Sequence, residues 1–148
     1  MFRGIHNQKL DAKGRLALPV RFRESLAGRD QTRLVVTGWI ECLWVYSLEE
    51  WLQVEENIRR LPSQHPDVMD FTRTFVGGAS EVELDGQGRF LVAQPLREFA
   101  GLEKEVMVVG LMNRIELWDK ARWLARLPST PEAYMALNQK MAGFGLNL

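Results

Sequence analysis

The chain has 148 residues, of which 46% are hydrophobic and 26% are charged. This balance is typical of a globular protein with a buried core, and it excludes a chain that is disordered throughout. Lysine plus arginine number 19, as do aspartate plus glutamate, so the formal net charge is zero. A polycation that coats nucleic acid without selectivity is therefore also excluded.

The positive charge nevertheless collects at the amino-terminal end. Residues 1 to 23 contain six basic side chains against the single carboxylate of Asp11, and the rest of the chain carries the balancing excess of acid. A basic end on a neutral chain indicates an electrostatic contact with an anionic partner, for which nucleic acid is the first candidate.

The first predicted unit is a β-hairpin. Residues 2 to 10 form a strand candidate, and residues 15 to 18 alternate as a half-buried strand does. Between them Asp11 can hydrogen-bond to its own backbone, and Gly14 can take a positive φ. These residues predict a tight turn with Lys13 at its tip.

A short helix and a second hairpin complete the first half. Residues 20 to 27 predict two helical turns, for which Gly28 is the C-terminal stop. The β-rich segments 34 to 37 and 42 to 46 predict two buried strands. Ser47, followed three positions later by a glutamate, predicts the N-cap of an amphipathic helix.

A further helix follows a loop at residues 62 to 66. Asp67 predicts its N-cap, and Gly77 with Gly78 predicts its end. Because this helix has no counterpart in the first half, we interpret it as a connector that packs two halves of the chain together.

The turn motif then occurs a second time. A shift of 74 residues superimposes three positions of the turn: Asp11 on Asp85, Gly14 on Gly88, and Arg15 on Arg89. Beyond a two-residue deletion, a shift of 72 places Gly38 on Gly110 and Trp51 on Trp123. A turn, a central glycine and a tryptophan kept in this order indicate an internal duplication.

The duplication predicts four segments. They are a first repeat at residues 1–61, a connecting helix at 62–79, a second repeat at 80–127 and a C-terminal tail at 128–148. Pro95 stands two residues beyond the position equivalent to Pro19, which predicts a later start for the short helix of the second repeat. In the tail, residues 131 to 141 predict one more helix.

The two turns and their flanking segments resemble the MraZ family, whose members contain two domains of the SpoVT/AbrB type. The resemblance covers residues 1 to about 127. It rests on Phe2, Gly4, the Leu10-Asp11-x-Lys13-Gly14-Arg15 motif, the Asp85-Gly-x-Gly88-Arg89 motif, and Gly110 with Glu116-Leu117-Trp118. It implies an α+β, mainly β fold: a pseudo-two-fold duplicated, AbrB-like swapped-hairpin β-barrel with peripheral helices.

The same resemblance implies a function. Members of the family are sequence-specific DNA-binding transcriptional regulators, which act on repeated boxes upstream of the division and cell-wall gene cluster. The resemblance also implies a homo-oligomer, assembled as a ring, that presents several turns to the promoter repeats of double-stranded DNA at the nucleoid.

The two copies differ in the side chains beside the turn. With alternate strand residues facing inward, the first copy presents Asn7, Lys9 and Lys13 to solvent, and the second presents Glu81, Glu83 and Gln87. Carboxylates repel phosphate, so we predict the main DNA surface on the first copy. The candidate DNA-binding residues are Arg3, Lys9, Lys13, Arg15 and Arg89.

Arg15 is the candidate base reader, because a planar guanidinium can donate two hydrogen bonds to O6 and N7 of guanine. Lys13 is a point charge suited to a phosphate. The alternative is that Arg15 and Arg89 simply pair with Asp11 and Asp85 across their own turns.

Two other functions compete with DNA binding. One is an acid/base enzyme built on Asp11 or Asp85, which the absence of a nucleophile elbow or a phosphate-binding loop disfavours, so we expect no enzyme. The other is an oligomeric protein-interaction scaffold without direct DNA readout, in which the acidic second copy recruits the partner.

The remaining expectations are negative. Cys42 is the only cysteine, so no intrachain disulfide is possible and a reducing compartment is expected. His6 and His65 have no ligand spacing, so neither a metal nor another cofactor is predicted. No apolar stretch approaches the roughly 20 residues that cross a bilayer, so we expect a cytoplasmic protein with no membrane partner.

Overall fold

The computed structural model describes residues 1–26 and 32–148 and shows an α+β fold with mainly antiparallel sheet. The strands are β1 Phe2–Lys9, β2 Arg15–Ala17, β3 Arg33–Trp39, β4 Cys42–Ser47, β5 Ser80–Glu83, β6 Arg89–Leu91, β7 Glu105–Met112 and β8 Arg114–Asp119. The helices are α1 Val20–Leu26, α2 Leu48–Arg59, α3 Pro66–Phe75, α4 Gln94–Ala100, α5 Lys120–Arg126 and α6 Pro131–Gly143. In the described part of the chain no helix combines the length and the apolar character that crossing a bilayer requires.

The sheet topology displays the duplication directly. Six strands pair in the order β1-β7-β8-β4-β3-β5, and this order reads the same from either end once equivalent strands of the two repeats are exchanged. The first strand of each repeat pairs with the other repeat: β1 lies antiparallel to β7, and β5 lies antiparallel to β3. The repeats are therefore interlocked rather than laid side by side as two independent units.

The sheet is open, so the expected closed barrel is wrong. Strands β2 and β6 hydrogen-bond to each other and form a separate two-stranded sheet, with Leu16 opposite Phe90. Because these short strands pair together after their turns, they do not join β1 to β5, and among residues 1–26 and 32–148 no further strand pairs with either edge of the six-stranded sheet.

Both repeats contribute to one main hydrophobic core. Leu16 and Phe90 from the small sheet pack with Leu34 and Leu117 from the large sheet, and each of these side chains is almost fully buried. The alternation predicted for β1 also holds, since Lys9 is exposed while its neighbour Leu10 is buried. Removing either repeat would expose the apolar surface of the other.

Most helix boundaries follow from the capping residues. The Ser47 hydroxyl accepts a hydrogen bond from the Glu50 N–H, as predicted for the start of α2. Helix α3 differs from the prediction, because its N-cap is His65, whose ring nitrogen accepts from the Asp67 N–H. Of the first short helix, 20 to 26 are helical as α1, and the predicted last residue and stop, Ala27 and Gly28, lie outside the described residues.

The second short helix does not begin late. Helix α4 starts at Gln94, which is the position equivalent to the start of α1 at Val20. Pro95 lies within its first turn, where a missing N–H costs no helical hydrogen bond.

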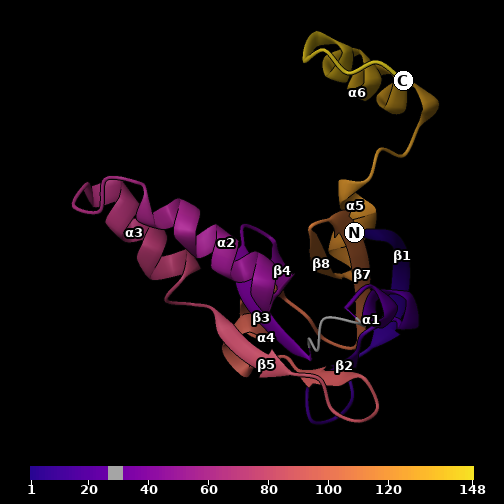
Figure 1. Cartoon of the computed structure of the whole chain (residues 1–148). Coiled ribbons are helices and arrows are strands. Elements are labelled where there is room, and N and C mark those ends of the chain that lie inside the picture. The colour runs from indigo at the N-terminus through magenta and orange to yellow at the C-terminus, as the bar shows by residue number, and fades with distance from the viewer. Residues whose placement is uncertain (27–31) are drawn as a thin grey trace.

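Two helical segments extend from the sheets. Helices α2 and α3 form an arm in Figure 1. Phe75 of α3 packs with Trp51 of α2 and Val35 of β3 in a second apolar cluster. The described packing of the connecting helix is thus mainly with the first repeat. Helix α6 lies apart from the other elements and buries none of its residues.

Candidate nucleic-acid interface

The first turn is organised by Asp11. One carboxylate oxygen accepts hydrogen bonds from the backbone N–H groups of Lys13 and Arg15, at 2.9 and 2.8 Å. The other oxygen accepts from the Arg15 Nε at 2.8 Å. Gly14 closes the turn with a φ of 82°, a conformation that favours glycine. The Lys13 side chain is left at the tip and is exposed.

The second turn repeats this arrangement. Asp85 accepts from the backbone N–H groups of Gln87 and Arg89, both at 2.9 Å, and from the Arg89 Nε at 3.0 Å. Gly88 has a φ of 74°. The Asp–Arg pairing that the sequence left as an alternative is therefore present in both turns.

These hydrogen bonds favour the ionised form of the two carboxylates. The backbone N–H of Arg15 is the largest cause that lowers the pKa of Asp11, although partial desolvation opposes it. The backbone N–H of Arg89 lowers the pKa of Asp85 in the same way. Both carboxylates therefore stay ionised to a lower pH than an unperturbed aspartate, and the ionised form accepts the hydrogen bond from the arginine beside it.

The two turns lie next to each other because β2 and β6 pair, and both loops are seen at the lower end of Figure 1. The Leu18 N–H donates to the Gly88 carbonyl and the Val92 N–H donates to the Gly14 carbonyl, each at 2.9 Å. The Arg89 Nη1 also reaches to 4.0 Å from the Asp11 carboxylate. The pair of turns is therefore one surface built from both repeats.

The five predicted DNA-binding residues do not all belong to this surface. Arg15 and Arg89 are brought together by the β2–β6 pairing, and Lys13 stands at the tip of the first turn. Lys9 is exposed at the end of β1, opposite Glu105 in the register. Arg3 is exposed near the start of β1, six residues from Lys9, which corresponds to about 20 Å of strand.

The acidic side chains of the second repeat are exposed as expected, and they have local partners. Glu81 lies 3.7 Å from the guanidinium of Arg33, and Glu83 accepts a hydrogen bond from the Thr32 hydroxyl at 3.1 Å. Both carboxylates lie on β5, which is an edge strand of the large sheet. Charge on an edge strand also opposes pairing with another sheet.

Two further arginines lie against the turns, Arg97 of α4 and Arg23 of α1, and neither belongs to the predicted DNA-binding set: the sequence assigns Arg23 to a short helix with a role in packing or subunit contacts, and it does not single out Arg97. Arg97 lies over Gly14, and Arg23 lies over Gly88, so each arginine contacts the turn of the other repeat. Arg23 and Arg97 are equivalent under the 74-residue shift, and that signal could have found them.

The structure gives the remaining candidates structural roles. The His6 ring packs edge-on against Phe22 with a centroid distance of 5.2 Å, and His65 caps α3. Among residues 1–26 and 32–148, no three histidine, cysteine or acidic side chains are grouped to hold a metal ion. An apolar hollow of about 500 Å³ lies between α3, α4 and β3, and its lining includes Phe75 and Phe99 but no residue of either turn.

Comparison with known proteins shows that both repeats match the same family model. The family model described as "MraZ protein, putative antitoxin-like" matches the chain twice, at residues 1–74 and 75–140. The chain belongs to the MraZ family. The second match ends within α6, so it takes in part of the tail that carried little of the resemblance in the sequence.

Individual MraZ relatives match over nearly the full length. The chain is 42% identical to the transcriptional regulator MraZ of Acetivibrio thermocellus over 146 residues, which are 99% of this chain and 100% of that relative. It is 43% identical to the protein of the same name from Moorella thermoacetica over 147 residues, with the same coverage. The relative from Shewanella amazonensis is 39% identical over 152 residues, again with 99% and 100% coverage. The relatives are thus named as regulators of transcription.

Proposed function

We propose that this chain is a sequence-specific DNA-binding transcriptional regulator of the MraZ type. Its target is double-stranded DNA with repeated short boxes, upstream of the division and cell-wall gene cluster. The observation that carries the proposal is the paired turn, which presents Lys13 and the two anchored arginines on one surface. The names of the relatives support the regulatory role.

The Asp–Arg pairing suits base readout. Asp11 accepts a hydrogen bond from the Arg15 Nε and so restricts the orientation of the guanidinium. The two terminal nitrogens of Arg15 donate no hydrogen bond to any described residue. An arginine oriented in this way loses less side-chain entropy when its terminal nitrogens donate to guanine O6 and N7. Arg89 is held by Asp85 in the same manner and is the second candidate reader.

The remaining candidates supply electrostatic attraction. Lys13 is the phosphate contact at the turn tip, and Arg3 and Lys9 extend the positive charge along β1. A two-stranded ribbon such as β2–β6 fits the major groove but offers few contacts by itself. Several copies on neighbouring boxes would combine these contacts through effective concentration.

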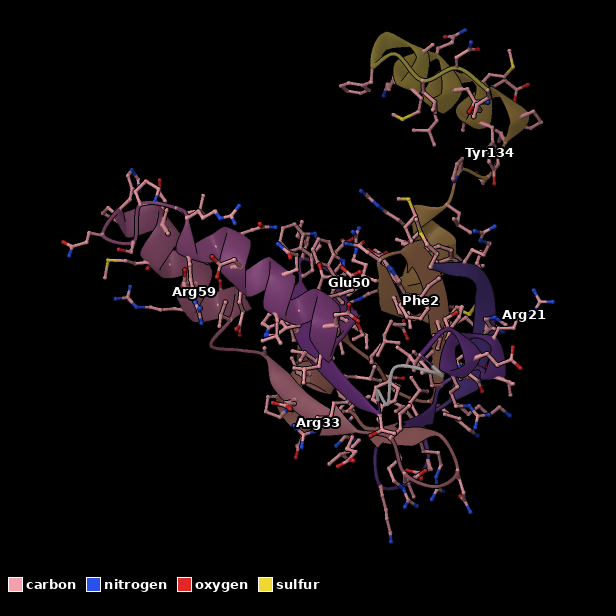
Figure 2. All side chains as sticks on the ribbon, in the orientation of Figure 1. Phe2, Arg21, Arg33, Glu50, Arg59 and Tyr134 are labelled. Carbon is pink, nitrogen blue, oxygen red and sulfur yellow. The ribbon has the colours of Figure 1, made fainter. Side chains whose placement is uncertain are left out.

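We therefore include in the proposal a homo-oligomeric ring that is associated with the nucleoid in the cytoplasm, and whose subunits have the AbrB-like swapped-hairpin arrangement. Exposed apolar side chains on α6 support such association, among them Tyr134 at 53% and Met135 at 60% exposure. Figure 2 shows Tyr134 on the helix that lies apart from both sheets.

Binding, not catalysis, is the proposed role of the turns. A carboxylate that the backbone keeps ionised, with a pKa below its usual range, is poorly suited to act as a general acid or base near neutral pH. The competing scaffold function would use the acidic edge of β5, but Glu81 and Glu83 already have local partners.

The test measures binding to the DNA upstream of the chain's own gene. Arg15→Ala should weaken binding to the upstream duplex about tenfold more than binding to a scrambled duplex, because the lost bidentate base contact contributes about 1–3 kcal/mol beyond the lost charge. Lys13→Ala should weaken binding to both duplexes by similar factors and reduce the salt dependence. Circular dichroism and the mass in solution serve as controls for folding and assembly.

The proposal fails if both variants bind the upstream DNA as tightly as the parent at every salt concentration. Retention of a protein partner after nucleic acid has been digested, together with no DNA binding by the parent, would instead establish the scaffold function.

A further inference from the structure

Arg23 and Arg97 differ from the arginines inside the turns. Arg15 and Arg89 each have an aspartate partner within 3.0 Å. For Arg23 and Arg97, none of the described carboxylates lies within the 4.0 Å of an ion pair. Their positive charges are therefore not neutralised by the turns against which they pack.

The packing is close enough that a side chain in place of either glycine would displace the arginine over it. A Cβ on Gly14 would stand 2.8 Å from the guanidinium carbon of Arg97, and one on Gly88 would stand 2.7 Å from that of Arg23. The two glycines therefore do more than permit a positive φ. They bring each guanidinium to the backbone of the opposite turn.

The hydrogen-bonding capacity of these arginines is also incompletely used. Arg97 donates from Nε to the Val92 carbonyl at 2.9 Å. The Arg23 Nε is buried and has no hydrogen-bond partner among the described residues. Both residues are only partly buried, and apart from the Arg97 Nε bond no hydrogen bond joins either guanidinium to a described residue.

Because each repeat places an arginine against the turn of the other, the charge at each turn changes. The first turn has Lys13 and, from the second repeat, Arg97. The second turn has the neutral Gln87 at its tip, but it receives Arg23 from the first repeat. Both turns therefore carry a cation beyond the internal Asp–Arg pair.

We propose that Arg23 and Arg97 are phosphate-binding residues, which hold backbone phosphates of duplex DNA on either side of the paired turns. Guanidinium groups form strong, charge-assisted hydrogen bonds with phosphate. The second repeat then contacts DNA through an arginine supplied by the first, in spite of its acidic β5. This inference rests on the proposed function and adds two residues and the second turn to its DNA surface.

The experiment uses the full chain carrying either Arg23→Gln or Arg97→Gln. The affinity of each variant for upstream and scrambled duplexes is measured at several salt concentrations from roughly 0.05 to 0.3 M. In each variant the slope of log K against log salt should become less steep by about 0.9. The affinity for both duplexes should fall about fivefold near 0.15 M salt. Arg23→Lys and Arg97→Lys should restore the parental slope, because they keep the charge.

Arg59→Gln is the matched control. Arg59 is an exposed arginine at the far end of α2, away from the turns in Figure 2, and its substitution should leave the slope unchanged. A purely structural role of Arg23 and Arg97 would change thermal stability and the fraction of active protein, but it would not change the salt slope.

Arg23→Met and Arg97→Met provide neutral variants that keep an unbranched stem over the glycine, in case the glutamine variants do not fold. If the parent protein binds upstream DNA and the neutral variants show the same salt slope as the parent, the inference is overturned and the proposed function stays intact. Failure of every neutral variant to fold would assign both arginines a structural role and overturn it as well. A parent that does not bind DNA would refute the proposed function itself.

Discussion

The first and second turns share one backbone but not one surface. In both, an aspartate accepts two backbone N–H bonds and one Nε bond from the arginine four residues later. In both, a glycine of positive φ lies under an arginine of the other repeat. The side chains at the tip differ, with Lys13 in one turn and Gln87 in the other.

The comparison separates what the turn needs in order to fold from what it presents. Asp, Gly and Arg occur in both copies because they make the same intramolecular contacts twice. The tip residues make no such contacts through their side chains and are free to diverge. The motif kept in both copies therefore fixes the shared structure of the turns and positions the two arginines that we propose as base readers, whereas the tip residues determine how the two surfaces differ in charge.

The largest expected effect tests whether the two hairpins share one core. Leu16 and Phe90 face each other between β2 and β6, and their exposed fractions are 0% and 1%. Phe90→Ala should lower the free energy of unfolding by about 3–5 kcal/mol and Leu16→Ala by about 2–5 kcal/mol, because each leaves a cavity. Urea denaturation should still show one transition in each variant.

Leu91→Ala is the control for this pair, because Leu91 is the next residue of β6 and is 51% exposed. Its effect should stay within about 0.5 kcal/mol. Two separate transitions in either core variant would mean that the repeats unfold independently, contrary to their interlocked sheet.

The next effect concerns the two glycines. Gly14→Ala and Gly88→Ala should each cost about 1–2 kcal/mol from the positive φ alone, and more if the arginine above is displaced. Gly86→Ala is the matched control, because nothing lies within 4 Å of the added Cβ and the equivalent residue of the first turn is Ala12. Thermal melting should leave this control close to the parent. A neutral Gly14→Ala would show that the turn is not constrained as described.

The sequence predicted these turns well and their surroundings less well. A turn is a local structure, so the order of Asp11, Gly14 and Arg15 was enough to predict it and to find it again 74 residues later. The pairing of β1 with β7 could not be predicted, since alternation identifies the buried face of a strand but not its partner. Arg97 was missed for a related reason, because its contact with Gly14 exists only after the repeats interlock.

Exchanging the tip residues sharpens the comparison on the side of function. Lys13→Gln should reduce DNA affinity about fivefold near 0.15 M salt, and Gln87→Lys should increase it by a similar factor if the second turn approaches phosphate. Both changes are at exposed positions, so neither should alter the melting temperature appreciably. Mobility shifts on upstream DNA at several salt concentrations provide the measurement. An unchanged affinity for Gln87→Lys would mean that only the first turn meets DNA.

The smallest effect is the response of the two aspartates to acid. Each has a folded-state pKa below its ordinary value of 3.8, so the folded protein binds fewer protons than the unfolded chain in that range. Their contribution to stability is complete above about pH 5 and is lost as the pH falls through the lowered pKa values. Asp11→Asn with Asp85→Asn should therefore be less stable than the parent at neutral pH, and the difference should shrink below pH ~4. Urea midpoints from pH 6 to pH ~2.5 would measure this difference in stability.

The two single variants test whether the turns are equivalent. Because both aspartates make the same hydrogen bonds, Asp11→Asn and Asp85→Asn should lose similar amounts of stability. A loss confined to one turn would show that the two Asp–Arg pairs are not equivalent in solution.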